Sequence, residues 1–264
     1  MVSSIDFMAL LPEFMKAADM AAKRIMQDHK KNLPVTAKPN GTPATETDLA
    51  AENLIMAHLR SVLDLPIVAE EAHAAGLAPA IHADEAFILV DALDGTRDFI
   101  RHGDDFTVNI ALIQNRAPVL GVIVAPVFGI SWHAALGHGT YRCDSGGRQQ
   151  VCVRVPDTAG LALLGGKTSS QPAVLEPFLG AHTVTSREHR ASSLKFCLLA
   201  EGQADVYPRL GDTCEWDTAA GDIILREAGG TVLDIITGQP LVYGKQDKGF
   251  INNGFIAGSK NTFI

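Results

Sequence analysis

Two carboxylates stand three residues apart in the stretch Asp91-Ala92-Leu93-Asp94-Gly95-Thr96, which follows the apolar run Phe87-Ile88-Leu89-Val90. A short apolar run is typical of a buried strand, and Asp-Gly is typical of a turn. We therefore expect both carboxylates on a loop just past a strand end. Such a loop can hold hard cations on its carboxylates and an anion on the backbone N–H groups where Thr96 begins a helix. The pattern indicates metal and phosphate chemistry, although an Asp-Gly turn alone is usually only a turn.

Three further acidic segments lie in comparable positions. Glu70-Glu71 follows the apolar run Ile67-Val68-Ala69, and the alternative to a cleft-facing position is a solvated charge pair. Asp217 stands at the start of an apolar helix that ends at Gly229-Gly230. Asp48 follows Thr45 at another helix start. Helix capping is the alternative for both aspartates, because it is a common task for this residue type. Each segment alone has an ordinary explanation, but the ordered set is much less expected by chance.

In this order and with these flanks, the chain resembles the inositol monophosphatase superfamily of Mg²⁺-dependent, lithium-inhibited phosphatases of small phosphorylated metabolites. Asp91 to Thr96 resembles the motif D-P-[IL]-D-G-T, with Ala92 in place of the usual Pro. Trp216 to Gly221 resembles W-D-x-A-A-G. Glu70-Glu71 matches the family's E-E pair, and Thr45 to Asp48 matches T-x-x-D. The resemblance covers nearly the whole chain.

Other segments are similar to one branch, the bacterial 3′(2′),5′-bisphosphate nucleotidases. They are Phe106 to Ile113, Leu120 to Val127, Ser192 to Gly202 and Tyr207-Pro208-Arg209. This similarity implies hydrolysis of adenosine 3′,5′-bisphosphate to AMP and phosphate, which clears a by-product of sulfate assimilation. Two departures concern the substrate side. Ala191 stands where the branch usually has Gly, and Gly165 to Ser169, which includes Gly166-Lys167, replaces a Ser-Arg-Ser-His-like run.

The resemblance also implies roles for individual residues. It implies two or three Mg²⁺ ions: the first on Glu70, Asp91 and the Leu93 carbonyl, the second on Asp91, Asp94 and Asp217, and a weaker third near Glu70. It implies that Asp48, Glu70 and Thr96 are catalytic, with Thr96 hydrogen-bonded toward Asp48. The implied substrate contacts are Leu93, Asp94, Gly95, Thr96, Ser193, Lys195, Arg209 and Asp217. Lys and Arg pair strongly with phosphate, although a solvated helix face is the alternative for Lys195.

Two other functions remain open at this level. One keeps the reaction and changes the substrate to inositol, fructose or histidinol phosphate. The cationic Lys195 and Arg209 favour a doubly phosphorylated nucleotide over these polyols. The other is a non-catalytic, metal-dependent nucleotide sensor. The presence of every expected metal ligand and of Thr96 argues against the sensor.

Composition narrows the class of protein. The 264 residues are 47% hydrophobic, which suffices for one sizeable domain, and the net charge of −8 argues against partners such as nucleic-acid polymers and anionic membranes. The spacings of Cys143, Cys152, Cys197 and Cys214 suit neither a zinc site nor a disulfide framework. No apolar run approaches the roughly 20 residues of a membrane span, and no export signal is evident. We expect a cytoplasmic monomer or homodimer acting on a small phosphorylated metabolite, with peripheral inner-membrane association left open.

The pattern of elements predicts an α/β (α+β) fold. Helices are expected over Ile5 to Lys31, Glu46 to Leu63, Pro172 to Leu179, Ser192 to Glu201 and from Asp217 onward. Strands are expected over Phe106–Ile113, Val119–Ala125, Ile130–Ala135, Leu161–Leu164, Thr183–Thr185, Ala204–Tyr207, Val232–Ile235 and Phe255–Ala257. The loop Asn32 to Pro43 is placed where it can lie over the site. We predict one catalytic domain over 1–264 with two lobes: about 1–145, with most metal ligands, and about 146–264, with Asp217 and the substrate contacts. The resemblance implies a layered α-β-α-β-α sandwich of the sugar-phosphatase type.

Overall fold

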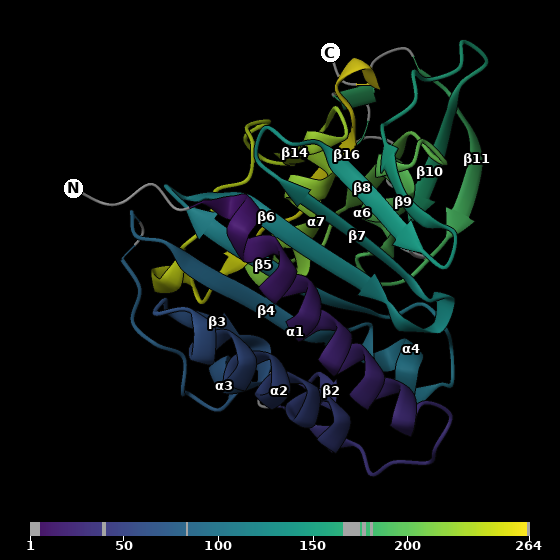
Figure 1. The fold of residues 1–264 in the computed structure, drawn as a ribbon. Coiled ribbons are helices and arrows are strands. Elements are labelled where there is room, and N and C mark those ends of the chain that lie inside the picture. The colour runs from purple at the N-terminus through teal and green to yellow at the C-terminus, as the bar shows by residue number, and fades with distance from the viewer. Residues whose placement is uncertain are drawn as a thin grey trace.

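The structure, a computed structural model, describes residues 6–38, 41–82, 84–165, 175, 178–179 and 182–262. Its larger sheet has seven strands in the order β3-β4-β5-β6-β7-β8-β9 (Figure 1). Their bounds are β3 Ile67–Ala69, β4 Phe87–Asp94, β5 Thr107–Gln114, β6 Ala117–Ala125, β7 Ile130–Ala135, β8 Thr140–Asp144 and β9 Gly147–Val151. Only β3 and β4 pair in parallel, and the other neighbours are antiparallel.

The smaller sheet has five strands in the order β11-β10-β12-β16-β14. They are β10 Leu161–Gly165, β11 Val184–His189, β12 Val206–Arg209, β14 Gly230–Asp234 and β16 Phe255–Ser259. Two short pairs complete the strands: β1 Thr36–Ala37 with β2 Pro43–Ala44, and β13 Thr213–Cys214 with β15 Ile251–Asn252. The pairing within the five-stranded sheet is mixed, with β10 parallel to both β11 and β12.

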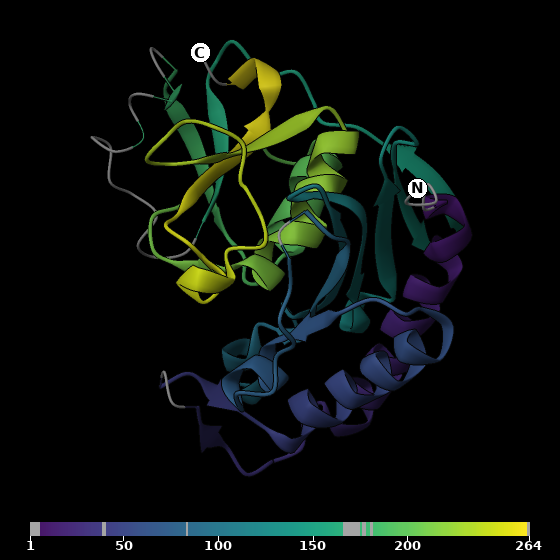
Figure 2. The ribbon, with the colours of Figure 1, turned by 90° about the vertical axis from the view of Figure 1, so that its left-hand side faces the viewer.

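Helices separate and cover the two sheets (Figure 2). The long helices α1 Phe7–Asp28 and α2 Glu46–Val62 pack on one face of the large sheet. Between the sheets lie α6 Leu194–Ala200 and α7 Glu215–Glu227. The short helices are α3 Glu70–Ala74, α4 Thr96–Ile100, and the 3₁₀ turns η1 Pro126–Phe128, η2 Gln246–Lys248 and η3 Lys260–Thr262. The helical residues Leu175 and Leu179 pack with the outer face of the smaller sheet. The alternating layers confirm the predicted fold class.

Strand β4 shows how the sequence produces this layering. Successive side chains of a strand point to opposite faces. Ile88 and Val90 accordingly join the core beneath α1 and α2. Phe87 and Leu89 join the core that contains α6 and α7. A strand buried on both faces therefore needs the continuous apolar run that the sequence has, and it carries Asp91 and Asp94 at its end.

Several element bounds differ from the sequence-based expectations. Helix α1 ends at Asp28 rather than Lys31, and α6 begins at Leu194 because Ser192 has a φ of 53°, outside the helical region. Strand β12 ends at Arg209 rather than Tyr207. Strands β8 and β9 were not predicted, because their sequence lacks a long apolar alternation. The helix expected over Pro172 to Leu179 lies largely outside the described residues.

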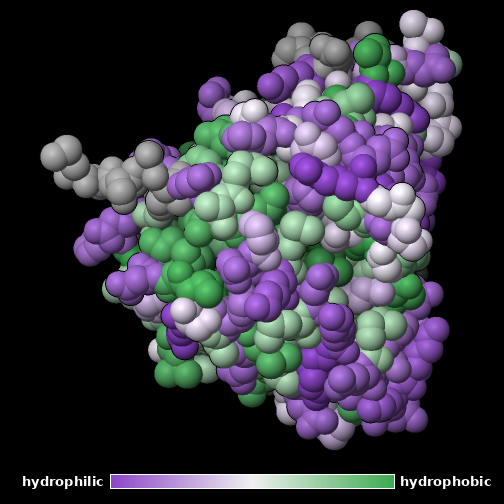
Figure 3. Space-filling view, in the orientation of Figure 1, coloured by the Kyte–Doolittle hydropathy of each residue, from purple (hydrophilic) through white to green (hydrophobic). Residues whose placement is uncertain are grey.

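The face that carries α1 mixes hydrophilic and apolar side chains, with apolar ones gathered toward the left of the view (Figure 3). None of the helices in the described part of the chain combines the length and apolar character that a membrane crossing requires. The boundary between the two predicted lobes stays a prediction.

Candidate functional site

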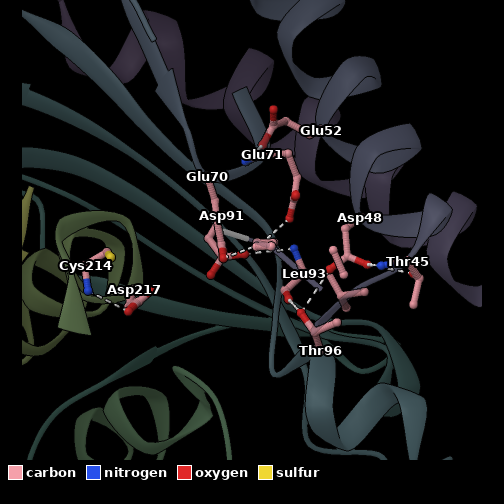
Figure 4. A network of polar contacts seen from close by, with 12 residues as sticks. Thr45, Asp48, Glu52, Glu70, Glu71, Asp91, Leu93, Thr96, Cys214 and Asp217 are labelled. Carbon is pink, nitrogen blue, oxygen red and sulfur yellow. Dashed lines mark hydrogen bonds and ion pairs between the residues drawn. The ribbon is translucent and has the colours of Figure 1, made fainter. Parts of the chain in front are cut away.

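Three carboxylates from different elements converge at one edge of the large sheet. Glu70 is the first residue of α3, Asp91 lies in β4, and Asp217 lies in the first turn of α7. One carboxylate oxygen from each lies within 4.8 Å of the others. Figure 4 shows Glu70 and Asp91 side by side, with Asp217 approaching from α7. The parallel pairing of β3 with β4 brings the first two together, and packing of α7 on the sheet brings the third.

This cluster is electrostatically unfavourable without cations. Burial, together with the neighbouring carboxylates Glu70, Asp94 and Asp217, raises the pKa of Asp91 well above its usual value. Burial, Asp94 and Glu70 do the same to the pKa of Asp217. Like charges in a buried site disfavour ionisation until a positive charge enters. Oxygen-only donors are the ligands that Mg²⁺ prefers, so the residues fit a divalent magnesium ion.

Lys38 belongs to this cluster, although nothing in its sequence context marked it. Its Nζ lies 2.6 Å from Oε1 of Glu70 and 2.5 Å from Oε1 of Glu71, and its side chain is 5% exposed. Burial alone would lower the pKa of Lys38, but the two carboxylates outweigh it and the pKa is raised. The residue extends from the end of β1, so the loop that the sequence placed near the site does contribute a side chain to it. Burial also raises the pKa of Glu71, despite the contact with Lys38.

Asp94 lies beside the three converging carboxylates and is held by donors from two other elements. Its Oδ2 accepts hydrogen bonds from the backbone N–H of Ser193 at 2.5 Å and from the Ser193 hydroxyl at 2.8 Å. The side-chain amide of Asn109 lies 3.4 Å from the same oxygen and 2.9 Å from the Ser193 hydroxyl. That hydroxyl also lies 2.8 Å from the carbonyl of Asp217. Ser193 is 2% exposed and links Asp94 to α7. It also lines the cavity that contains Lys195 and Arg209, and its contact with the substrate stays a prediction.

Asp217 has a second contact that agrees with the capping alternative. Its Oδ2 accepts a hydrogen bond from the backbone N–H of Cys214 at 2.8 Å, at the start of α7 (Figure 4). An acidic side chain in the first turn also interacts favourably with the helix dipole. Capping and membership of the cluster are therefore both properties of the same side chain.

Thr96 and Asp48 form a hydrogen-bonded pair, as the sequence resemblance implied. The Thr96 hydroxyl lies 2.9 Å from Oδ1 of Asp48 and 3.0 Å from the Leu93 carbonyl. Oδ2 of Asp48 accepts hydrogen bonds from the backbone N–H and hydroxyl of Thr45, which forms a capping box at the start of α2. The cap fixes the Asp48 side chain and leaves its second oxygen for Thr96.

Gly95 is required by the turn between β4 and α4. Its φ is 97°, and a Cβ there would lie 2.8 Å from the carbonyl oxygen of Asp105. Positive φ is accessible mainly to glycine. The residue therefore allows the close chain reversal that places Asp94 and Thr96 on either side of it.

Lys195 and Arg209 line a cavity of about 120 Å³ together with Asp94 and Asp217. Lys195 is 7% exposed, which excludes the solvated-face alternative. Its Nζ donates hydrogen bonds to the carbonyls of Ser192 at 2.6 Å and Arg190 at 3.3 Å. Burial lowers the pKa of Lys195 to about 8 against the opposing effect of Asp94. The carboxylate cluster and a cationic recess thus adjoin each other.

Other charged residues that the sequence did not single out support these elements. Glu52 accepts hydrogen bonds from the backbone N–H groups of Glu71 at 2.7 Å and Ala72 at 2.8 Å, which fixes the start of α3. Burial raises the pKa of Glu52 to about 7. Arg190 makes a bidentate ion pair with Asp105, with nitrogen–oxygen distances of 2.7 and 2.9 Å. Glu52 could have been found from the sequence, because it is a charged residue at a helical position that is expected to be buried. Asn109, a polar residue between the apolar Val108 and Ile110 of β5, carried a similar signal.

The departures from the family pattern are accommodated. Ala92 is 3% exposed and packs in the core beneath α1 and α2. Ala191 does not have a positive φ, so glycine is not needed there, and its N–H donates to Oδ2 of Asp105 at 3.0 Å. Of the segment Gly165 to Ser169, only Gly165 lies within the described residues, so the placement of Gly166-Lys167 is not described.

Comparison with known proteins gives one family. The model of the inositol monophosphatase family matches residues 8–261. The 3′(2′),5′-bisphosphate nucleotidase CysQ of Escherichia coli strain K12 is 40% identical over 252 residues, which covers 93% of this chain and 98% of that protein. The protein of the same name from Buchnera aphidicola is 36% identical over 252 residues, covering 94% of this chain and 93% of that protein.

Solved structures agree with the sequence comparison. The crystal structure of CysQ from Bacteroides thetaiotaomicron superposes with a TM-score of 0.79 at 30% identity, covering 97% of this chain and 98% of that one. An inositol monophosphatase from Anabaena has a TM-score of 0.75 at 23% identity, with coverage of 97% and 93%. The second similarity concerns the fold alone.

Proposed function

This chain belongs to the inositol monophosphatase family, and we propose that it is a Mg²⁺-dependent 3′(2′),5′-bisphosphate nucleotidase that hydrolyses adenosine 3′,5′-bisphosphate to AMP and phosphate. The observation that carries the proposal is the shared cavity: Asp94 and Asp217 line it together with Lys195 and Arg209. A metal-binding carboxylate group beside two cations matches a substrate that has one phosphate to cleave and a second to anchor.

The residues that would hold metal are Glu70, Asp91 and Asp217, with Asp94 and the Leu93 carbonyl next to them. When bound, divalent ions would neutralise phosphate charge, lower the pKa of a bound water and stabilise the leaving oxygen. Two ions are our proposal for the working enzyme.

Thr96 and Asp48 would orient the attacking water. When the Thr96 hydroxyl donates to Asp48, its oxygen lone pairs can accept a hydrogen bond from water. The Asp48 carboxylate is fixed by its hydrogen bonds with Thr45 at the start of α2. It would therefore hold the Thr96 hydroxyl with its proton pointing toward Asp48. Glu70 would accept a proton from that water. Gly95 and Thr96 would contribute backbone N–H groups to the phosphate oxygens.

Lys195 and Arg209 would bind the phosphate that is not cleaved. The ammonium group of Lys195 is buried and already oriented by two carbonyls, so little side-chain freedom is lost on binding. Hydrogen bonds between charged partners are stronger than those between neutral ones. A polyol monophosphate has no group of this kind to place against them.

Phosphate release from adenosine 3′,5′-bisphosphate, measured with Mg²⁺ and with excess EDTA, tests the proposal. We expect release only with the metal, and none from the Asp94→Asn variant although it folds. The Asn side chain keeps an oxygen that can accept the Ser193 hydrogen bonds, so the fold is retained while the charge is lost. Asp104→Asn is a matched control, because Asp104 has a 50% exposed side chain. Near wild-type activity in Asp94→Asn would reject the proposal. A cytoplasmic location and a monomeric or homodimeric state remain predictions.

A further inference from the structure

The ammonium group of Lys38 lies inside the carboxylate cluster, where a cation would otherwise be expected. It contacts one oxygen of Glu70 and one of Glu71 at 2.6 and 2.5 Å. Glu70 is also one of the three residues whose oxygens converge with Asp91 and Asp217. The positive charge of Lys38 therefore shares a ligand with the proposed metal centre.

The backbone around Lys38 is fixed in a way that holds this position. Strands β1 and β2 pair through Thr36 with Ala44 and through Ala37 with Pro43. The Lys38 backbone N–H donates to the Thr42 carbonyl at 2.8 Å. The side chain thus extends from a hydrogen-bonded hairpin toward Glu70 and Glu71, and it is nearly excluded from water.

The ammonium group of Lys38 is positioned to compete with a metal ion for the same carboxylate. Five carboxylates lie in or next to the cluster: Glu70, Glu71, Asp91, Asp94 and Asp217. Lys38 is in direct contact with two of them, Glu70 and Glu71. A third divalent ion at Glu70 would meet the ammonium of Lys38 at contact distance, and like charges so close in a buried site repel strongly.

We propose that Lys38 takes the place of a third divalent cation, so that this protein binds two metal ions and its own ammonium group. The proposal rests on the proposed metal-dependent function. It adds that the cation position at Glu70 is occupied by a side chain of the protein, Lys38, instead of a metal ion. It also assigns Lys38 a positioning role, because the ammonium group fixes the Glu70 and Glu71 side chains without contacting the reacting atoms.

The test counts Mn²⁺ ions bound per chain at saturation, from the electron paramagnetic resonance signal of free Mn²⁺, with no substrate present. We expect two ions for the wild type and three for Lys38→Met. Lys38→Arg keeps the positive charge and is expected to bind two. Lys31→Met is the matched control, because Lys31 also pairs with a carboxylate, Asp28 at 3.1 Å, but is 59% exposed.

Three ions in the wild type would overturn the proposal, because Lys38 would then not exclude the third. Two or fewer ions in Lys38→Met would overturn it equally. Circular dichroism checks that each variant folds, and Lys38→Gln replaces Lys38→Met if the latter does not. The count requires no turnover, so a failure of the phosphatase assay and a failure of this proposal are separate results.

Discussion

Ser193 donates both its backbone N–H and its hydroxyl to one oxygen of Asp94, at 2.5 and 2.8 Å, although 99 residues separate the two in the chain. The same hydroxyl lies 2.8 Å from the Asp217 carbonyl. One buried serine therefore fixes the end of β4 relative to the start of α7. The relative position of Asp94 and Asp217, which a two-ion site requires, depends on this contact.

Thr96→Ala is expected to lower kcat by roughly 10²–10⁴-fold, the range typical of proton-transfer catalysis, with a much smaller change in KM. The reason is that the hydroxyl orients water in the transition state and need not contact the bound substrate. Steady-state kinetics with adenosine 3′,5′-bisphosphate measure both constants. Thr96→Ser keeps the hydroxyl contact with Asp48 and should retain most of the activity. An unchanged kcat in Thr96→Ala would leave Thr96 as a structural residue only.

Removal of metal should destabilise the wild type at neutral pH, because Asp91 and Asp217 are buried beside other carboxylates. Each Mg²⁺ ion, at about 100 times its dissociation constant, should add about 2.7 kcal/mol to the free energy of unfolding, or roughly 5–10 °C per ion in Tm for a chain of this size. Thermal denaturation with Mg²⁺ or EDTA measures the shift. In Asp91→Asn we expect a higher Tm without metal and little response to Mg²⁺. A wild-type Tm that does not respond to Mg²⁺ would contradict the metal assignment.

Asp222 offers a pH test at a residue that is not part of the metal cluster. Burial raises its pKa to about 6, against the ion pair with Arg226 at 3.1 Å and a hydrogen bond from Tyr243 at 2.9 Å. The folded protein therefore binds a proton on the Asp222 carboxyl more tightly than the unfolded chain does. This contribution to stability is complete below the unfolded pKa of about 3.9 and is lost as the pH rises through about 6.

The loss amounts to about 3 kcal/mol for a shift of this size. The side chain at position 222 cannot titrate in Asp222→Asn. Between pH 4 and pH 7, the free energy of unfolding of the wild type should therefore fall by about 3 kcal/mol more than that of the variant. Urea titrations of both proteins at several pH values, all with Mg²⁺, measure the difference. Parallel pH profiles for the two proteins would show that Asp222 does not have a raised pKa.

Most of the fold follows from local pattern. The spacing of the apolar residues Phe7, Leu11, Phe14, Ala18, Ala21 and Ile25 places one face of α1 on the sheet. All of them are buried except Phe7, which is half-buried. The apolar run before Asp91 produced a strand buried on both faces. Strands β8 and β9 were not predicted because half-exposed and exposed residues dominate them. The pairing of β8 with β7 and of β9 with β8 supplies the order that their sequence does not.

The site residues that belong to a sequence motif could be predicted. Those whose position depends on packing between distant parts of the chain could not. The Thr96–Asp48 contact and the convergence of Glu70, Asp91 and Asp217 were expected from ordered motifs. The place of Lys38 was not, because it depends on how a short hairpin lies against α3, and no local pattern encodes that. The burial of Lys195 likewise follows from α6 lying between two sheets.

Arg209→Ala should narrow substrate preference without abolishing hydrolysis. A hydrogen bond between charged groups contributes about 1.5–3 kcal/mol, which is about one to two powers of ten in kcat/KM. We expect kcat/KM for adenosine 3′,5′-bisphosphate to fall by that factor, while the value for inositol 1-phosphate stays nearly constant. Arg60→Ala, on the exposed side of α2, is the control. An equal fall for both substrates would assign Arg209 a structural role.

The most direct test of the account is the ratio of kcat/KM for adenosine 3′,5′-bisphosphate to that for inositol 1-phosphate, measured on the wild type with Mg²⁺. The second phosphate gains contacts with Lys195 and Arg209 that a monophosphate cannot make, so the ratio should exceed about 10. A ratio below one would contradict the nucleotidase assignment and leave only membership of the family.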